Sequence, residues 1–322
     1  MTRITLLQRT KITARNKLKN IYVNNKSNIV FVIAVRIRKF FFNIKHIYNS
    51  TLLKRRGFKV INNIPITYKS SLRLDIVFCS IERDLITLEY SLKSIRKYLM
   101  HPINKVYVVA PNSEKIIDFC NKNKCIFINE EDNFPFTLNQ INYEITINNK
   151  KYDRSGWLFQ QFLGLSGDLF CEESNYLLFD SDTVLNRPQT FEYNGKCVLN
   201  YADTVHKQYF IAYEKLFGNK PICPASLTSH MMIINKDYLK DMKTAIKNYT
   251  GNNWYEEIIN MIDNKIPSLC SDYENYAQFV LSKHKDTFLL SYWYNETLFR
   301  SDLNDSHVDK KIKSISYHHY NN

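Results

Sequence analysis

Between Leu74 and Phe179 the sequence alternates short apolar segments with amphipathic ones, and this alternation restricts the fold more than any other feature. The apolar segments predict buried strands, and the segments with apolar residues three or four positions apart predict helices. Strands that alternate with helices at this spacing form a mostly parallel sheet flanked by helices, so we predict an α/β fold. The predicted strands are 74–79, 106–110, 125–128 and 175–179, and the predicted helices are 84–99, 113–121 and 156–167.

The second half of the chain shows the same two periodicities with more irregular spacing. A polar stretch, 130–155, separates the halves and predicts a hairpin near 143–151. Beyond the helix-strand unit that ends at Phe179, we predict strands at 231–234 and 312–316 and helices at 236–248, 252–262 and 272–284. No internal repeat is present, so we expect one domain of this kind.

Charge is distributed unevenly along the chain. The formal net charge is +13, from 44 basic and 31 acidic residues. Residues 1–74 contain 17 of the basic residues and no acidic one, so the remaining 27 basic and 31 acidic residues give the body a net charge of −4. We therefore divide the chain into a basic N-terminal extension, 1–73, and a domain, 74–322.

The extension mixes cations with apolar side chains. Its longest apolar run, 29–35, is far shorter than the roughly 20 residues needed to span a bilayer. The basic residues Arg36, Arg38 and Lys39 and the basic cluster 54–56 flank the aromatic residues 40–42. This mixture is typical of an element that lies on an anionic membrane surface. The alternatives are an ordinary solvated or packed helix, and nucleic-acid binding, which lacks a recognisable module and is not expected.

The cysteines and the first residues favour a cytoplasmic protein. The seven cysteines are an odd number and form no CxxC pair, so a disulfide framework or a zinc finger is not indicated. No apolar segment followed by a small-residue cleavage site opens the chain. We expect a cytoplasmic location, at the inner face of the cell membrane if the extension binds lipid.

The motif with the clearest chemistry is Asp180-Ser181-Asp182, which directly follows the predicted strand 175–179. Side chains alternate along a strand, so carboxylates two residues apart project to the same side. Two carboxylates at a strand end form an oxygen-rich site for Mn²⁺ or Mg²⁺, ions that also bind diphosphate oxygens. The alternative is a polar turn that the Asp side chains cap.

Two further polar residues follow the first predicted strand. Ligands of parallel sheets bind at the carboxyl ends of strands, and this rule places Ser80 and Asp84 at the same edge as Asp180. Ser80 and Asp84 are therefore candidates for contact with a donor nucleotide. The alternative for Asp84 is the N-cap of the following helix.

Five segments of the domain form a recognisable series of motifs, in the order WLFQQ at 157–161, YLLFDSDT at 176–183, NRP at 186–188, LTSHMMII at 227–234 and SDYENY at 271–276. This series resembles an uncharacterised bacterial family of glycosyltransferase-like proteins. The resemblance covers about residues 74–320 and implies a GT-A-like (Rossmann-like) fold, a nucleotide-sugar donor and a divalent metal, Mn²⁺ or Mg²⁺. In the family pattern a Lys often follows the Gln pair, and Gly164 stands near that place here.

The resemblance implies a role for each acid of the motif. Asp182 is expected to bind the metal directly, and Asp180 to contact the donor ribose, or the metal through water. GT-A enzymes often complete the metal shell with a C-terminal His, which makes His318 a candidate ligand. A pair of His near a chain end can equally be inert.

The predicted helix 156–167 and Ser181 form the candidate donor-binding group. Gln161 shares a helix face with Trp157, so Gln161 could bond sugar hydroxyls while Trp157 stacks on the sugar. Gln160 is the other polar residue in this apolar helix. The alternative is that the Gln side chains make structural hydrogen bonds within the protein.

Acceptor chemistry is assigned to three residues. His230 precedes the predicted strand 231–234 and could contact acceptor or phosphate, or be structural. An inverting transferase needs a carboxylate that takes the acceptor proton, and Asp272 and Glu274 are the candidates. The alternative is a capping box in which Ser271 and Glu274 bond each other's amides. On this helix we expect Glu274 to face away from the apolar stripe.

Together these residues predict a metal-dependent glycosyltransferase, a hexosyl- or related transferase. It would move a sugar from a nucleotide-sugar donor to a glycan or glycolipid acceptor, in bacterial surface polysaccharide synthesis. Retaining and inverting enzymes share the Asp motif, so both outcomes stay open. The alternative is a non-catalytic nucleotide-sugar or carbohydrate-binding protein. A phosphoryl-transfer enzyme is disfavoured, because the sequence has no Gly-rich phosphate loop.

Overall fold

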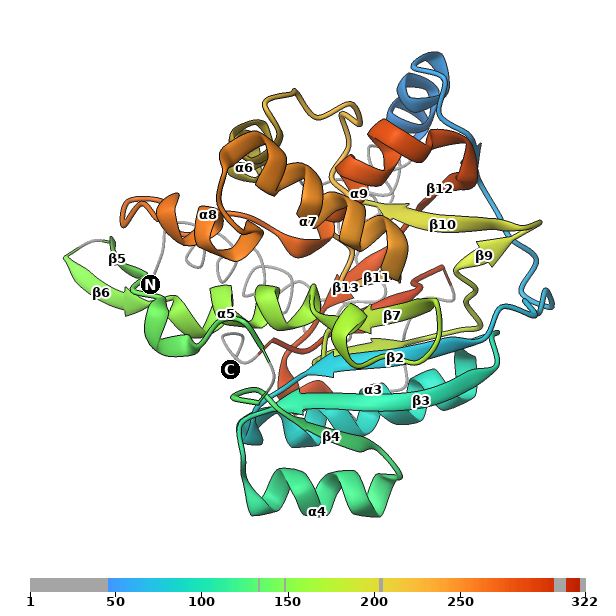
Figure 1. Cartoon of the computed structure of the whole chain (residues 1–322). Helices are drawn as coiled ribbons and strands as arrows, with labels where there is room; N and C mark the ends of the chain where they lie inside the picture. Colours follow the sequence, from blue (N-terminus) through green and yellow to red (C-terminus); the bar gives the residue numbers. More distant parts are fainter. Residues whose placement is uncertain (1–45, 133, 148, 203–204, 304–310, 319–322) are drawn as a thin grey trace, which may run out of the picture.

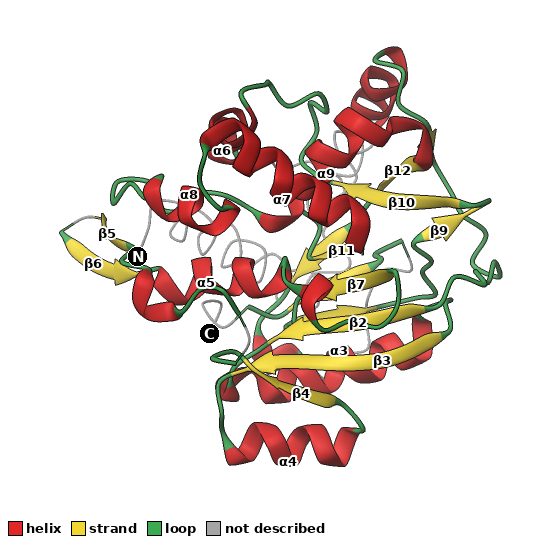
Figure 2. Cartoon of the chain, viewed as in Figure 1, coloured by secondary structure: helices red, strands yellow, loops and turns green. Residues whose placement is uncertain are grey.

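The computed structural model describes residues 46–132, 134–147, 149–202, 205–303 and 311–318. These residues form a mixed α/β fold in which a mostly parallel sheet is flanked by helices (Figures 1 and 2), so the predicted fold class is confirmed. Figure 1 shows α3 behind this sheet and α5 in front of it. The helices are α3 Leu85–Tyr98, α4 Glu114–Asn123, α5 Ser155–Gly164, α6 Lys207–Phe217, α7 Lys236–Thr250, α8 Trp254–Asn260 and α9 Asp272–His284.

The main sheet has five strands, and the acidic motif follows the strand that lies second from its edge. Parallel strands covered on both faces consist of nearly continuous apolar residues, as in the fully buried β2. Only the pairing of β11 with β7 is antiparallel. The order is β11 Met231–Asn235, β7 Asn175–Phe179, β2 Leu74–Cys79, β3 Ile103–Ala110 and β4 Ile126–Asn129.

A second sheet contains strands that the sequence did not predict. β1, β12 and β10 are parallel to one another, and β9 pairs antiparallel with β10. The short β1 lies in the segment that was predicted to be a separate extension. The order is β1 Val60–Ile61, β12 Phe288–Tyr292, β10 Lys196–Tyr201 and β9 Glu192–Tyr193.

Two small sheets complete the described strands. β8 directly follows the acidic motif and pairs antiparallel with β14, which pairs in parallel with β13. The hairpin predicted near 143–151 is present as β5 and β6. The bounds are β8 Thr183–Leu185, β13 Asn295–Thr297, β14 Ser314–Ser316, β5 Glu144–Ile147 and β6 Lys150–Asp153.

Helix α7 has a capping residue at each end. The side chain of Asn235 accepts hydrogen bonds from the amides of Asp237 and Tyr238 at the start of α7. Gly251 ends α7 with φ of 84°, in the left-handed region that glycine adopts readily. Short 3₁₀ turns occur at Glu82–Asp84, Leu138–Gln140, Gly167–Leu169, Lys285–Thr287 and Arg300–Asp302.

The described part of the N-terminal extension packs into the body. Residues 46–55 are helical, and Leu53 and Phe58 are 1% and 5% exposed within the main core. β1 pairs with β12, with Val60 opposite Leu290. The predicted division after residue 73 therefore falls inside the packed body. Lys54, Arg55 and Arg56 are exposed.

The apolar run 29–35 and the cations and aromatic residues at 36–42 lie outside the described residues. No helix in the described part of the chain combines the length and the apolar composition that a membrane crossing needs.

Candidate active site

The acidic pair lies at the carboxyl end of β7, where backbone hydrogen bonds fix it. The amide of Asp180 donates to the carbonyl of His230 at 3.0 Å, and the amide of Tyr317 donates to the carbonyl of Asp182 at 2.8 Å. The carbonyl of Ser181 accepts from the Ser91 hydroxyl at 3.0 Å. The motif is therefore held between β11, α3 and the segment after β14, with both carboxylates partly exposed.

Both carboxylate oxygens of Asp180 have partners. The Tyr273 hydroxyl donates to Oδ1 at 2.6 Å, and Nδ1 of His230 lies 3.0 Å from Oδ2. His230 has φ of 65°, a left-handed conformation that costs an ordinary residue roughly 1–2 kcal/mol. Pairing of Met231 with Phe179 immediately beyond it helps to impose this conformation. Such strain concentrates at functional sites.

Asp182 forms an ion pair with His318. Nδ1 of His318 lies 2.7 Å from Oδ2 of Asp182, and the rings of His318 and His230 are 5.4 Å apart. Burial favours the neutral carboxyl of Asp182, but the charge and hydrogen bond of His318 outweigh it and lower its pKa to about 2. For His318, burial works against the charged ring, but Asp182 raises its pKa above the ordinary value.

Arg300 is a residue of this site that the sequence did not indicate. Its Nε donates to the carbonyl of Tyr317 and its Nη1 to the carbonyl of Arg83, both at 3.1 Å. Its Nη2 donates to Asp84. Asp84 stands at the N-cap position of α3 but makes no side-chain cap bond there. The predicted donor contact of Asp84 would thus involve a carboxylate already paired with Arg300.

Asp272, at the start of α9, is the buried carboxyl beside the acidic pair. Burial and the charge of Asp180 raise its pKa to about 8. Its amide donates to Oε1 of Gln161 at 3.1 Å. A Cβ atom on Gly164 would lie 3.0 Å from Oδ2 of Asp272 and 2.8 Å from Leu178. A side chain at position 164 would therefore require the side chains of Leu178 and Asp272 to shift, because α5 lies close to β7 and α9.

Glu274 occupies a different environment from the one predicted. Residues 272–281 of α9 are all buried, so the expectation that Glu274 faces away from the core is wrong. Its carboxylate accepts from the amide of Leu227 at 2.9 Å, the hydroxyl of Ser226 at 3.2 Å and Nε2 of Gln278 at 2.9 Å. These contacts give Glu274 a structural role, which leaves Asp272 as the candidate base beside Asp180.

The predicted capping box at the start of α9 is half present. Ser271 accepts from the amide of Glu274, as predicted. The side chain of Glu274 does not reach back to Ser271, because it bonds the segment before β11 instead. The amide of Leu227, in the protein interior, has thus replaced the amide of Ser271 as the partner of the Glu274 carboxylate.

The candidate donor residues divide into two groups. Gln161 bonds the amide of Asp272, and Nε2 of Gln160 lies 3.5 Å from the carbonyl of Cys79. Ser80 is 7% exposed, and its buried hydroxyl has no hydrogen-bond partner in the described part of the chain. These three residues therefore lie around the ends of β2 and α9.

Trp157 and Ser181 are placed differently from these three. Trp157 carries the guanidinium of Arg154 4.3 Å from its ring centre, and its ring lies 6.4 Å from that of Tyr143. Among the described residues, no hydrogen bond or ring contact joins Trp157 to the acidic pair. Ser181 lies between the two acids, but its side chain is buried.

The side chains at this site include the ligand types that divalent metals prefer. Two carboxylates and one imidazole suit Mn²⁺, and carboxylates suit Mg²⁺. Among the described residues, no group of three or more His, Cys, Asp and Glu is arranged around a shared point, and Asp182 and His318 bond each other instead. The residue types fit a metal, and the metal-ligand set Asp180, Asp182 and His318 stays a prediction. All seven cysteines are free thiols.

Comparison with known proteins places the chain in a family. A family model described as "Family of unknown function (DUF6492)" matches residues 69–318. A search of curated proteins by sequence gives no match.

Two solved structures are similar in arrangement. The apo form of mouse xyloside xylosyltransferase 1 is 10% identical, covers 78% of this chain and 99% of its own, and has a TM-score of 0.44. The galactosyltransferase LgtC, solved in complex with donor and acceptor sugar analogs, is 12% identical, covers 76% of this chain and 87% of its own, and has a TM-score of 0.38.

Proposed function

The chain belongs to DUF6492, a family of unknown function, and we propose that it is a metal-dependent glycosyltransferase that uses a nucleotide-sugar donor. The observation that carries the proposal is the meeting of Asp180, Asp182 and His318 at the carboxyl end of β7. This is the edge at which parallel α/β sheets bind ligands. The donor atoms suit an ion that also binds diphosphate oxygens.

Asp182 and His318 are the proposed direct ligands of Mn²⁺ or Mg²⁺. They lie within hydrogen-bond distance of each other, so a small rotation of either side chain would direct both toward one ion. A bound divalent ion would neutralise charge on the leaving nucleoside diphosphate. Asp180, whose carboxylate is fixed by Tyr273 and His230, would contact the donor ribose or the ion through water.

The donor is proposed to lie across the ends of β2 and β7. The unpaired hydroxyl of Ser80 is a ready hydrogen-bond donor at this edge. Gln160 and Gln161 would bind sugar hydroxyls, with Gln161 linking the donor to the Asp272 amide. Asp84, held by Arg300, would face the nucleotide.

Asp272 is the proposed general base of an inverting reaction. A base works best when its pKa lies near the operating pH, and burial beside Asp180 raises the pKa of Asp272 to about 8. The carboxylate form would take the proton of the acceptor hydroxyl as the sugar is transferred. His230, next to Asp180, would contact the acceptor or phosphate.

The acceptor is proposed to be a glycan or glycolipid used in surface polysaccharide synthesis. The basic residues before Leu74, including the exposed cluster at 54–56, would bring the enzyme to an anionic membrane that carries such an acceptor.

Calorimetry tests the proposal directly. Binding of UDP, GDP, CDP and CMP would be measured with and without Mn²⁺. We expect one nucleotide to bind only with Mn²⁺. Absence of binding by all four under both conditions would overturn the proposal.

Turnover separates an enzyme from a binding protein. The nucleotide-sugar that corresponds to the bound nucleotide would be incubated with the protein and Mn²⁺, and release of free nucleoside diphosphate would be followed. We expect slow donor hydrolysis by water in the absence of acceptor. Donor binding without any release, with and without candidate acceptors, would identify a non-catalytic nucleotide-sugar-binding protein.

A further inference from the structure

A second polar site lies at the opposite end of strands β8 and β14 from the acidic pair. At one end of this strand pair the amide of Tyr317 bonds the carbonyl of Asp182, and at the other the amide of Asn186 bonds the carbonyl of Lys313. Each strand is three residues long, which separates the two ends by about 10 Å. The two sites are therefore distinct but share these strands.

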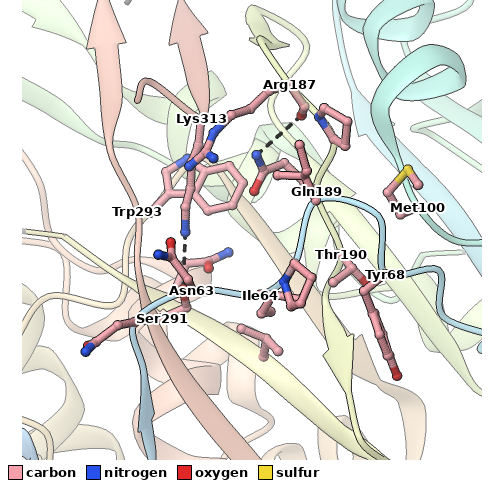
Figure 3. A pocket seen from close by; sticks show the side chains of 16 residues that line it. Asn63, Ile64, Tyr68, Met100, Arg187, Gln189, Thr190, Ser291, Trp293 and Lys313 are labelled. Carbon is pink, nitrogen blue, oxygen red and sulfur yellow. Dashed lines mark hydrogen bonds between the residues drawn. The ribbon is translucent and has the colours of Figure 1, made fainter. Parts of the chain in front are cut away.

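The second site is a cavity lined by two cations (Figure 3). Its free space is about 30 Å³, and Arg187 and Lys313 extend into it side by side. The described residues that line it include no Asp or Glu. Its polar lining otherwise consists of uncharged side chains, among them Asn63, Asn200 and Ser291.

Lys313 is surrounded by uncharged partners. Its ammonium donates to the hydroxyl of Ser291 at 3.2 Å and to the carbonyl of Tyr292 at 2.5 Å, and it lies 5.0 Å from the ring centre of Trp293. Burial, followed by the charge of Arg187, lowers the pKa of Lys313 to about 7. Two neighbouring, partly buried cations repel each other, and an anion between them would favour their charged forms.

One more group in the cavity has unused hydrogen-bonding capacity. Nε of Arg187 is buried without a hydrogen-bond partner in the described ranges. The side chain of Asn200, which is 3% exposed, also lines the cavity. Buried polar groups of native proteins are nearly always paired, so donors gathered around one cavity indicate a ligand.

The position of the cavity in the fold supports the same conclusion. β1 ends at Ile61 and β12 at Tyr292, and these strands are parallel. Asn62, Asn63 and Trp293, which follow them directly, line the cavity. The carboxyl edge of a parallel sheet is where α/β proteins bind ligands.

We propose that this cavity binds a phosphate-sized oxyanion between Arg187 and Lys313, with the Asn200 amide as a further donor. Arg and Lys give charge-assisted hydrogen bonds to oxyanions, and a guanidinium can bind two oxygens at once. The oxyanion is either free phosphate or the phosphate group of a larger molecule. The site does not depend on the proposed transferase activity.

Calorimetry and thermal shift on the full chain test this site, with inorganic phosphate in one arm and glycerol 1-phosphate in the other. Lys313→Met and Arg187→Gln should each weaken binding about ten- to a hundredfold. Lys311→Met removes the same charge from an exposed position two residues away and should bind like wild type. Tighter binding of the ester would assign the site to a phosphate group on a larger molecule.

Absence of binding by wild type in both arms would overturn the proposal, and so would unchanged binding by Lys313→Met. If Lys313→Met fails to fold, Arg187→Lys decides. It keeps the charge but lacks the two-pronged guanidinium, so we expect weaker binding, and unchanged affinity would overturn the proposal.

Discussion

Two polar sites lie at the carboxyl edges of two different parallel sheets, and they carry opposite charge. At the end of β7 two carboxylates are each paired with a His. Beyond β1 and β12, two cations share a cavity whose described lining has no carboxylate. One fold thus uses the same kind of sheet edge for a site that suits a metal and a site that suits an anion.

The two sites differ in what surrounds the charged groups of Asp182 and Lys313. The carboxylate of Asp182 is stabilised by an oppositely charged partner, which lowers its pKa despite burial. Lys313 has only neutral partners, and its pKa falls toward neutral pH. The first site thus contains its own oppositely charged partner, whereas in our proposal an anion from solution would supply one to the second.

The largest effect is expected from Asp182→Ala. Loss of a proposed direct ligand should abolish Mn²⁺-dependent nucleotide binding and reduce turnover more than about a hundredfold. The same variant should bind phosphate like wild type, whereas Lys313→Met should keep nucleotide binding. Calorimetry with both ligands on both variants measures this, and loss of both ligands in either variant would mean that the sites are not independent.

Asp272→Asn should lower kcat by about a hundred- to ten-thousandfold while nucleotide affinity is kept. In the metal-free protein, burial beside Asp180 raises the pKa of Asp272 from 3.8 to about 8. Between these values the folded state binds a proton that the unfolded state has lost, so this group makes stability fall as pH rises.

The Asn variant should therefore lose that part of the pH dependence and gain stability at pH 8 relative to wild type. Denaturant unfolding at pH 5 and pH 8 measures the difference. Parallel pH profiles for the two proteins would contradict the assignment of Asp272.

Glu274→Ala should destabilise the protein without a selective effect on chemistry. It removes the acceptor of the Leu227 amide, of the Ser226 hydroxyl and of one N–H of Gln278 in the core, at about 2–4 kcal/mol. The exposed Glu131→Ala is the matched control and should change stability by less than about 0.5 kcal/mol. If the Glu274→Ala variant were as stable as wild type but had lost turnover, Glu274 would again be a candidate for the general base.

The smallest effect concerns cations outside both sites. Removal of residues 1–45 takes away 11 Lys and Arg but leaves β1 and the buried Leu53 in place. We expect at least about tenfold weaker binding to phosphatidylserine-containing vesicles, with donor turnover unchanged. Vesicle co-sedimentation measures this, with neutral phosphatidylcholine vesicles as control. Equal binding by the full and shortened chains would remove the membrane-surface interpretation.

The first half of the fold could be predicted closely from the sequence. The strands 74–79 and 175–179 match β2 and β7 to the residue, because continuous apolar runs bounded by polar residues leave little choice. β10 and β12 were not predicted. β10 contains the polar residues Lys196 and Asn200, so its sequence is not a continuous apolar run. β12 follows α9 after a single 3₁₀ turn, so no loop signal separates the two elements in the sequence.

The candidate site could be predicted in part. Asp180, Asp182, His230 and His318 do come together, although they span 139 positions of the chain. Arg300 could not be found, because an isolated Arg in a 3₁₀ turn has no local signal. Glu274 was misplaced because periodicity treats a charged residue as exposed, whereas here the fold supplies buried donors for it.

The strand pair β8 and β14 brings residues 313–318 into contact with both polar sites. Residues 313–318 present an ammonium group to one site and an imidazole to the other, five positions apart in the chain. Cleavage of the chain just before Lys313 would therefore remove a side chain from both candidate sites at once.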